Sequence, residues 1–321
     1  MGILDRLRRT LGIAGEKCSL VVRPVPDEAN PLWRYFARNK GRVIHKWHHY
    51  FDIYHNHFHR FRGRPVTLLE IGVFQGGSLQ MWKQYFGPEA RICGVDINPD
   101  CKQFEEDQIQ IFIGDQTDRE FISELKNTLG HIDIVIDDGG HTMIQQLTTF
   151  RELFPFVGET GIYLVEDLHT SYWEEFGGGY KANGSFVEYA KGFIDSMNAW
   201  HSRDPRLVPD SMTRTATGIH FYDSILVIEK YPNGSKPIQS MTGSDSELAA
   251  IRKAAERATS SEGNPPGNPR VLPRGSQGGR GEARGRCAWN RLSEVTRNAG
   301  EHGRSPLAGW RLKSDDIVPW P

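Results

Sequence analysis

The chain has 321 residues, a formal net charge of −1 and 38% hydrophobic residues. That length suits one large domain or two smaller ones, and a net charge this close to zero gives no reason to expect a nucleic acid or an anionic membrane as partner. No apolar run approaches the ~20 residues that a membrane helix needs, so we expect no stable membrane association. The four cysteines are scattered without metal-ligand spacing, which favours reduced thiols and a cytoplasmic location.

Residues 1–30 differ in pattern from residues 31–235 and are predicted to be a separate N-terminal segment. Met1–Ala14 mixes leucines and arginines at the spacing of a short basic amphipathic helix, without the apolar core of a secretory signal. A helix that frays or packs locally explains this pattern better than a membrane anchor. Residues 31–235 are predicted to form the main domain, with residues 31–62 as its leading helical segment.

The leading segment is rich in aromatic residues and histidine. His45/His49 and His55/His59 are spaced i, i+4, as zinc ligands on a helix are. No acid or cysteine accompanies them at a recognisable spacing, so we prefer a helix that packs on the edge of the sheet. Tyr54 or a histidine is then a candidate to face the cleft.

Residues 66–230 alternate strand-like and helix-like patterns, which is typical of a parallel sheet covered by helices. The predicted strands are Val66–Ile71, Arg91–Asp96, Ile109–Ile113, Ile132–Asp137, Gly161–Glu166, Gly218–Phe221 and Ser224–Glu229. The predicted helices are Ser78–Tyr85, Asp100–Glu106, Asp118–Leu129, Thr142–Phe154 and Phe186–Ala199. The last two strands nearly touch, which permits a hairpin and forbids a parallel crossover. The sequence therefore predicts an α/β fold: a Rossmann-like, seven-stranded, mostly parallel sheet with a C-terminal antiparallel hairpin and helices on both faces.

Residues 236–321 are predicted to be a low-complexity, disordered tail. Ser246–Ala258 can form a short helix, but Thr259 to Gly309 is dominated by Gly, Pro, Ser, Arg and Asn. Such a segment buries too little apolar surface to offset the entropy lost on ordering.

Two hydrophobic runs end in adjacent carboxylates. The first leads into Asp137 and Asp138, with His141 three residues further on, and the second leads into Glu166 and Asp167. Because open α/β sheets bind ligands at the carboxyl ends of their strands, these groups are a candidate metal and proton-transfer site. The alternative is that Asp137 and Asp167 only cap the next helices.

The first strand turns through a glycine-rich loop into a helix, as in many nucleotide sites. The loop is not G-x-G-x-x-G, so the dinucleotide fingerprint fails. Acids instead lie at successive strand ends: Glu70 suits the amino group of S-adenosylmethionine (SAM), Asp96 the ribose hydroxyls and Asp115 the adenine edge. The predicted SAM-binding residues are Glu70, Gly72, Gln75, Gly76, Ser78, Asp96, Asp115, Gln116 and Asp137.

Several of these motifs together resemble one known family. They are Leu69-Glu70-Ile71-Gly72, Gly76-Gly77-Ser78, Val95-Asp96, Gly114-Asp115, Ile136-Asp137-Asp138-Gly139-Gly140-His141 and Val165-Glu166-Asp167-Leu168-His169-Thr170-Ser171-Tyr172-Trp173. Over roughly Lys46 to Lys230 the chain resembles class I SAM-dependent methyltransferases. More narrowly, it is similar to the metal-dependent macrolide sugar (mycinamicin-type) and rhamnosyl O-methyltransferases and the cephalosporin hydroxylase-like group.

The resemblance implies an Mg²⁺ ion held by Asp138 and Asp167, with Glu166 as a further candidate, and His141 as the general base. The implied activity is methylation of a hydroxyl on a sugar or glycosylated natural product, as in antibiotic biosynthesis. The partner would be that small-molecule acceptor, and a homo-oligomer is left open. The aromatic-bearing segments Tyr172–Gly184 and Trp200–Thr217 are candidate acceptor loops.

Two alternatives remain. An NAD-dependent oxidoreductase of Rossmann type should show the glycine fingerprint and usually a second substrate domain. A non-catalytic SAM-fold binding protein should lack the base or a metal ligand.

Overall fold

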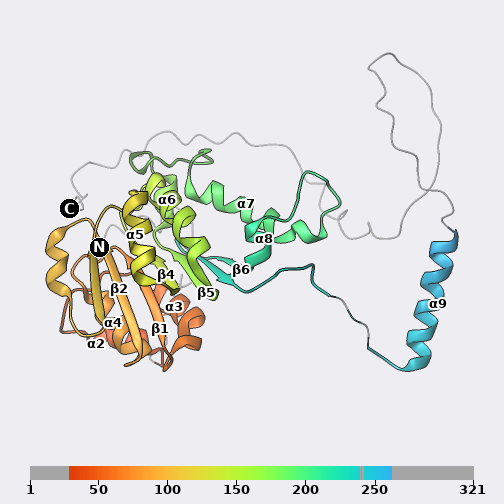
Figure 1. The fold of residues 1–321 in the computed structure, drawn as a ribbon, viewed down its shortest axis with the longest axis horizontal. Coiled ribbons are helices and arrows are strands. Elements are labelled where there is room, and N and C mark those ends of the chain that lie inside the picture. The colour runs from red at the N-terminus through yellow and green to blue at the C-terminus, as the bar shows by residue number, and fades with distance from the viewer. Residues whose placement is uncertain (1–28, 239, 241, 262–321) are drawn as a thin grey trace, which may run out of the picture. The chain divides into compact units, whose positions relative to one another are not determined.

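The computed structural model describes residues 29–238, 240 and 242–261. The chain divides into two units after residue 241. The first contains the sheet and its helices (Figure 1), and the described part of the second contains helix α9 (Asp245–Ser261), where a short helix was predicted. The predicted N-terminal helix Met1–Ala14 and most of the predicted tail lie outside the described residues, and the domain boundaries stay predictions.

Seven strands form a single sheet in the order β3-β2-β1-β4-β5-β7-β6. Their bounds are β1 Val66–Ile71, β2 Ala90–Asp96, β3 Ile109–Ile113, β4 Ile132–Asp137, β5 Val157–Val165, β6 Ala216–Phe221 and β7 Leu226–Lys230. The first five strands pair in parallel, whereas β7 runs antiparallel to both β5 and β6. This topology confirms the predicted Rossmann-like fold with its C-terminal hairpin.

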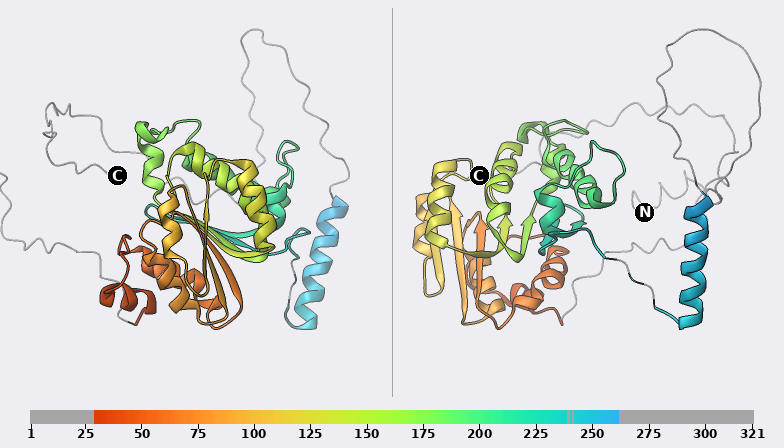
Figure 2. Two further views of the ribbon diagram at one scale, coloured as in Figure 1. Left: turned by 60° about the vertical axis from the view of Figure 1, so that its left-hand side comes forward. Right: turned by 45° about the vertical axis from the view of Figure 1, so that its right-hand side comes forward.

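Helices cover both faces of the sheet (Figure 2). On one face lie α2 (Pro31–Arg38), α3 (Tyr50–Phe58) and α4 (Gly77–Phe86). On the other face lie α5 (Arg119–Leu129), α6 (Met143–Leu153) and α7 (Phe186–Asn198). The remaining short elements are α8 (Ser211–Thr215) and the 3-10 turns η1 (His59–Phe61), η2 (Pro99–Phe104), η3 (Phe154–Phe156), η4 (Leu168–Tyr172), η5 (Glu174–Phe176) and η6 (Ala199–His201). None of the described helices is long and apolar enough to cross a membrane.

Strand β1 shows why the sheet is buried on both faces. Leu68 belongs to the core cluster beneath α3 and α4, while its neighbour Leu69 belongs to the cluster beneath α5 and α6, and both side chains are fully buried. Parallel sheets between two helical layers have this continuous apolar character. An ionisable residue such as Glu70, fully buried near the end of the same strand, is therefore out of place unless it has a polar partner.

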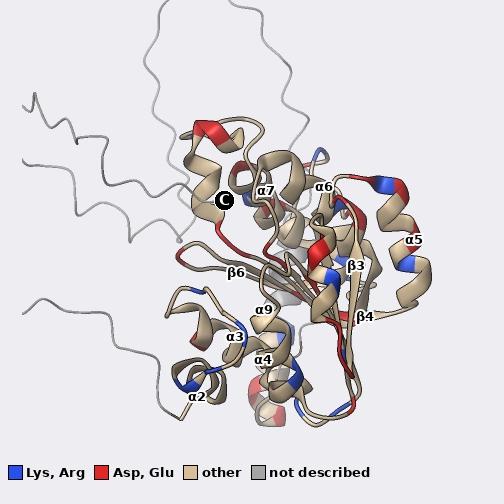
Figure 3. Ribbon diagram, turned by 90° about the vertical axis from the view of Figure 1, so that its left-hand side faces the viewer, with Lys and Arg blue, Asp and Glu red and all other residues tan. Residues whose placement is uncertain are grey.

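Helix α5 shows how the outer layer is built. The side chain of Asp118 accepts hydrogen bonds from the backbone N–H groups of Glu120 and Phe121 and so caps the helix. Ile122 and Leu125 face the core, while both charge signs occur along the helix (Figure 3). This amphipathic pattern seats α5 on the sheet.

Apart from shifts of one to three residues at other element ends, two predicted elements differ from the structure. Strand β5 begins at Val157, four residues before the predicted start, because the exposed Glu159 and Thr160 interrupt an otherwise buried strand. The predicted helix Asp100–Glu106 is the 3-10 turn η2, which Pro99 starts and Asn98 caps.

Candidate active site

Asp138, His141 and Asp167 meet at the carboxyl ends of β4 and β5, which are neighbours in the sheet. Their potential ligand atoms all lie within 4.8 Å of one another. The Nε2 atom of His141 is 3.7 Å from Oδ1 of Asp138 and 3.5 Å from Oδ2 of Asp167. All three side chains are part-exposed, so the structure brings the predicted base and two predicted metal ligands together where a ligand can reach them.

The backbone at this cluster is strained. His141 has φ 57° and Asp167 has φ 53°, a left-handed conformation that non-glycine residues seldom adopt. Helix α6 after β4 is capped by Thr142 and Gln145, and Asp167 makes no side-chain cap hydrogen bond to η4. The capping alternative for Asp137 and Asp167 is therefore wrong, and strain at both strand ends is typical of functional sites.

Lys46 is a central residue of the site that the sequence patterns did not single out. Its side chain is only 3% exposed, and its Nζ lies 3.0 Å from both carboxylate oxygens of Glu166 and 3.4 Å from Oε1 of Glu70. Nζ also donates to Oδ2 of Asp138. Burial alone would lower the pKa of Lys46, but the surrounding carboxylates raise it well above its usual value. One fixed cation thus holds acids from three strand ends.

Two tyrosines of helix α3 donate hydrogen bonds to Glu166 and Asp167, the adjacent acids after β5. The hydroxyl of Tyr50 donates to Oδ1 of Asp167 at 2.8 Å, and that of Tyr54 donates to Oε1 of Glu166 at 2.6 Å. Tyr54, named from the sequence together with the histidines as a candidate to face the cleft, is fully buried and reaches the site through this bond to Glu166. Burial raises the pKa of Glu166 well above its usual value. Glu166 faces Lys46 and Tyr54 and is not in the metal-type cluster found among the described residues, so its role as a ligand stays a prediction.

The glycine loop lies on the other side of Asp138. Gly72 has φ 95°, and a Cβ atom there would lie 2.0 Å from the backbone oxygen of Asp138. Only glycine permits this close approach between the loop after β1 and the backbone that follows β4. Further along, Gly76 has φ 69° and is the N-cap residue of α4. Its neighbour Gln75 is exposed.

Two of the predicted cofactor acids, Asp96 and Glu70, accept hydrogen bonds from groups in or next to the glycine loop. Oδ2 of Asp96 accepts the backbone N–H groups of Val73 and Phe74 at 2.9 and 3.1 Å. Glu70 accepts from the Ser78 hydroxyl at 2.7 Å, and burial raises its pKa. These bonds hold the glycine loop in place; direct contacts with a cofactor stay predictions.

The acids after β3 and β4 are held in the same way. Asp115 accepts from the backbone and hydroxyl of Thr117 at 2.7 and 2.9 Å. The buried Gln116 donates to Oδ1 of Asp137 at 3.1 Å and accepts from the N–H of Gly140 at 2.9 Å. Burial raises the pKa of Asp137 to about 7, against the opposing effect of the Gln116 hydrogen bond. Gln116 therefore links the ends of β3 and β4.

The zinc alternative for the histidine pairs of the leading segment, which the sequence pattern disfavoured, gains no support among the described residues. Among the described residues, neither His45/His49 nor His55/His59 belongs to a metal-type cluster. Nδ1 of His55 contacts the hydroxyl of Tyr85 at 2.8 Å instead. Spacing along a helix places two imidazoles on one face but supplies no third ligand.

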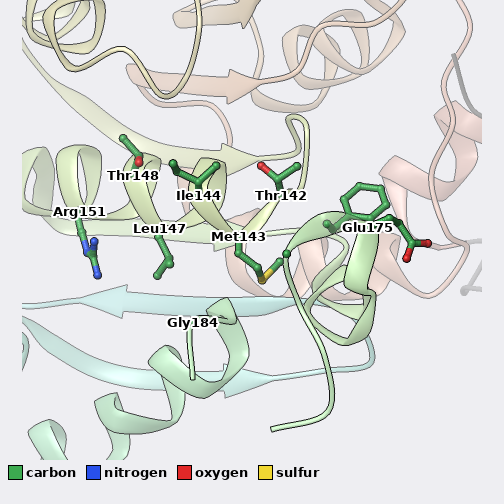
Figure 4. A pocket seen from close by; sticks show the side chains of 10 residues that line it. Thr142, Met143, Ile144, Leu147, Thr148, Arg151, Glu175 and Gly184 are labelled. Carbon is green, nitrogen blue, oxygen red and sulfur yellow. The ribbon is translucent and has the colours of Figure 1, made fainter. Parts of the chain in front are cut away.

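A pocket of about 530 Å³ is open along helix α6. Its lining residues are Thr142, Met143, Ile144, Leu147, Thr148, Arg151, Glu175, Phe176, Gly177 and Gly184 (Figure 4). Helix α6 supplies one wall, and part of the predicted acceptor loop Tyr172–Gly184 supplies the other. Thr142, the residue after His141, is the lining residue that lies nearest in sequence to the candidate base.

No family model matches the chain. Individual relatives do match. The chain is 35% identical over 231 residues to the 8-demethyl-8-(2-methoxy-alpha-L-rhamnosyl)-tetracenomycin-C 3'-O-methyltransferase of Streptomyces olivaceus, covering 68% of this chain and 58% of the relative. It is 35% identical over 233 residues to the mycinamicin VI 2''-O-methyltransferase of Micromonospora griseorubida, covering 69% and 57%. The chain thus spans a little over half the length of these curated relatives.

A solved structure agrees with the sequence relatives. The MycE methyltransferase of the mycinamycin biosynthetic pathway, in complex with Mg, SAH and mycinamycin VI, superposes with a TM-score of 0.58 at 31% identity. The match covers 71% of this chain and 59% of that one. By sequence and by fold, this chain is a homologue of the antibiotic-sugar O-methyltransferases within the class I SAM-dependent methyltransferases.

Proposed function

We propose that the protein is a SAM- and Mg²⁺-dependent O-methyltransferase that methylates a sugar hydroxyl of a glycosylated small molecule. One observation carries the proposal: Asp138, His141 and Asp167 converge at the sheet edge, beside the glycine loop. The named activities of the relatives, and the Mg and SAH in the similar MycE structure, support the same conclusion.

The residues present fit a hard divalent cation. Asp138 and Asp167 each have one carboxylate oxygen held by the protein, through Lys46 and Tyr50, and the other directed toward the cluster. Oriented carboxylate oxygens suit Mg²⁺. Asp138 and Asp167 would hold the ion, and Glu166 would reach it only on leaving Lys46. When bound, the ion would orient the acceptor hydroxyl and lower its pKa.

His141 is the proposed general base. Mg²⁺ prefers oxygen ligands, so the imidazole is better suited to receive the hydroxyl proton than to bind the ion. In the reaction the acceptor oxygen forms a bond to the methyl carbon, the carbon–sulfur bond breaks, and a neutral thioether leaves. The proton moves to His141, whose positive charge would then lie near Asp138 and Asp167.

The proposed SAM site runs along the glycine loop and the ends of β1 to β4. Its residues are those predicted from sequence: Glu70, Gly72, Gln75, Gly76, Ser78, Asp96, Asp115, Gln116 and Asp137. The close backbone approach at Gly72 and the loop amides held by Asp96 support a preformed cofactor loop. Against an NAD enzyme, the loop lacks G-x-G-x-x-G.

The pocket beside α6 is the proposed site for the body of the acceptor. Ile144, Leu147 and Phe176 offer apolar surface, and Arg151 and Glu175 offer charge, a mixture that suits a glycosylated ring system.

We also propose a cytoplasmic location, supported by the buried free thiols of Cys93 and Cys101.

A single assay tests the proposal. The purified chain is incubated with methyl-labelled SAM and a panel of rhamnosylated, macrolide and phenolic acceptors, with Mg²⁺ or with EDTA. We expect label transfer to a sugar hydroxyl, loss of transfer with EDTA and recovery with added Mg²⁺. Calorimetry with SAM and with NAD separates the alternatives: binding of NAD but not SAM would overturn the proposal.

A further inference from the structure

A second group of metal-type ligands lies on the face of the sheet covered by α3. It consists of His57 from α3, His220 from β6 and Glu229 from β7, with potential ligand atoms all within 4.8 Å of one another. Nδ1 of His57 lies 2.9 Å from Oε1 of Glu229, and Nε2 of His220 lies 3.7 Å from Oε2 of the same residue. Glu229 thus faces one imidazole with each of its oxygens.

The hairpin register produces this convergence. Glu229 is two residues after Val227, which belongs to the core cluster beneath α3, so both side chains point to that face. Gly218 is paired with Glu229 across the hairpin. A Cβ atom at Gly218 would lie 2.8 Å from Nε2 of His220 and 3.5 Å from Oε2 of Glu229. The missing side chain therefore leaves the space into which His220 turns.

The partners of the two imidazoles differ. Nε2 of His57 contacts the hydroxyl of Tyr222 at 2.9 Å, so both of its ring nitrogens are engaged. Nε2 of His220 is shielded from solvent and has no hydrogen-bond partner among the described residues. A shielded nitrogen that points at a carboxylate 3.7 Å away is unusual, because buried polar atoms are nearly always hydrogen-bonded.

Neighbouring groups act on the pKa values of both His57 and Glu229. Burial lowers the pKa of His57. Burial would raise the pKa of Glu229, but the hydrogen bond with His57 and the nearby charges lower it overall. Arg60 is the other charged group that acts on both, and its Nη2 donates to the backbone oxygen of Thr160 at 3.1 Å.

We propose that His57, His220 and Glu229 form a second metal site, selective for zinc-type transition ions. Two imidazoles and one carboxylate are a typical zinc donor set. One ligand atom from each of the three residues lies within 4.8 Å of the other two, close enough for small side-chain movements to bring all three to one ion. Tyr222 would then accept from the Nε2–H of His57 and fix its tautomer. The side chains of His220 and Glu229 are 39% and 28% exposed, so the proposed site lies close to the surface although Nε2 of His220 is itself shielded.

The ion would join α3 to the β6–β7 hairpin. The same helix carries Tyr50 and Tyr54, which hold Asp167 and Glu166. The proposed ion would tie this helix to the hairpin, and the inference does not depend on the proposed methyl transfer.

Cobalt(II) titration of the full chain tests the site. The titration uses an Asp138→Asn/Asp167→Asn background, so that the first cluster cannot bind. We expect one equivalent of Co²⁺ to bind with visible d–d absorption, to be displaced by Zn²⁺ and not by Mg²⁺, and to raise the Tm. His220→Asn and Glu229→Gln should each weaken binding by more than about 100-fold, and Tyr222→Phe by about 10-fold.

His131→Gln is the matched control, because its Nε2 makes a similar contact with Asp133 at 2.8 Å on an exposed surface. It should leave Co²⁺ affinity unchanged. His220 is part-exposed, so His220→Asn should still fold, and circular dichroism of the metal-free variants verifies this. Absence of Co²⁺ binding at 100 µM protein, or binding that His220→Asn and Glu229→Gln leave unchanged, would overturn the proposal.

Discussion

The two clusters of potential metal ligands differ in their donors. Asp138, His141 and Asp167 offer two carboxylates and one imidazole, whereas the second cluster offers two imidazoles and one carboxylate. Oxygen donors favour Mg²⁺ and nitrogen donors favour zinc-type ions. Ligand composition therefore favours a different ion for each of the two proposed sites.

The clusters also differ in how the backbone holds them. His141 and Asp167 are left-handed, while His57, His220 and Glu229 have no positive φ. Strain of this kind persists only where the surrounding contacts enforce it, and at the first cluster Lys46 and Tyr50 supply such contacts. The positive φ angles therefore set the proposed catalytic cluster apart from the second cluster, whose backbone is relaxed.

Removing the carboxylates of the first cluster should have the largest effect on activity. We expect Asp138→Asn and Asp167→Asn each to reduce Mg²⁺-dependent turnover by about 10³-fold or more, because the ion loses a carboxylate ligand. Steady-state kinetics with varied Mg²⁺ measures the loss. SAM affinity by calorimetry should change little. Turnover that stays at the wild-type level and is still abolished by chelators in both variants would refute the assignment of Asp138 and Asp167 as metal ligands.

Removing the base should have the next largest effect. His141→Asn is expected to reduce turnover by about 10²–10⁴-fold and to leave SAM affinity nearly intact. Asparagine tolerates the left-handed backbone better than most residues, so the variant isolates the loss of the imidazole. The pH–rate profile supplies the second readout, since its acidic limb should disappear. Full activity in this variant would exclude His141 as the base.

Lys46→Met tests the buried cation. The variant leaves Glu70 and Glu166 buried without a counter-charge, which should cost about 3–5 kcal/mol of unfolding free energy at pH 8. Both carboxylates already have raised pKa values, and loss of Lys46 raises them further. A raised acid pKa means that the folded state binds the extra proton, so the variant should gain stability as pH falls toward their ordinary pKa values.

Urea unfolding at pH 5.5 and pH 8 measures this dependence. Lys83→Met is the matched control, since Lys83 pairs with Glu106 at 3.1 Å but is 28% exposed. It should cost less than about 1 kcal/mol at either pH. Equal losses in the two lysine variants would argue against a central role for Lys46.

Paired hydroxyl deletions give the smallest and most discriminating effects. Tyr50→Phe removes a hydrogen bond to Asp167, and we expect kcat to fall by about 10-fold, with Co²⁺ affinity at the second cluster unchanged. Tyr222→Phe should do the reverse. If either variant changes both readouts equally, the two clusters do not act separately.

The sequence predicted the sheet well because buried parallel strands leave hydrophobic runs that end in polar residues. The grouping of Asp138 with Asp167 resulted from the parallel register of β4 and β5. Lys46 had no such signal, because it lies in the loop before α3 and reaches the acids only through tertiary packing. The second cluster could not be predicted from the sequence for the same reason, because His57 and His220 are 163 positions apart and meet only through tertiary packing.

The contact between Gly72 and Asp138 has a consequence for engineering. The loop proposed for the cofactor and the strand end proposed for the metal touch through backbone atoms, with no room for a side chain between them. Substitutions that reshape the cofactor loop will therefore displace the acceptor half of the reaction as well. Cofactor preference and acceptor preference therefore cannot be optimised independently. Mutant libraries should vary the loop after β1 and the residues after β4 together.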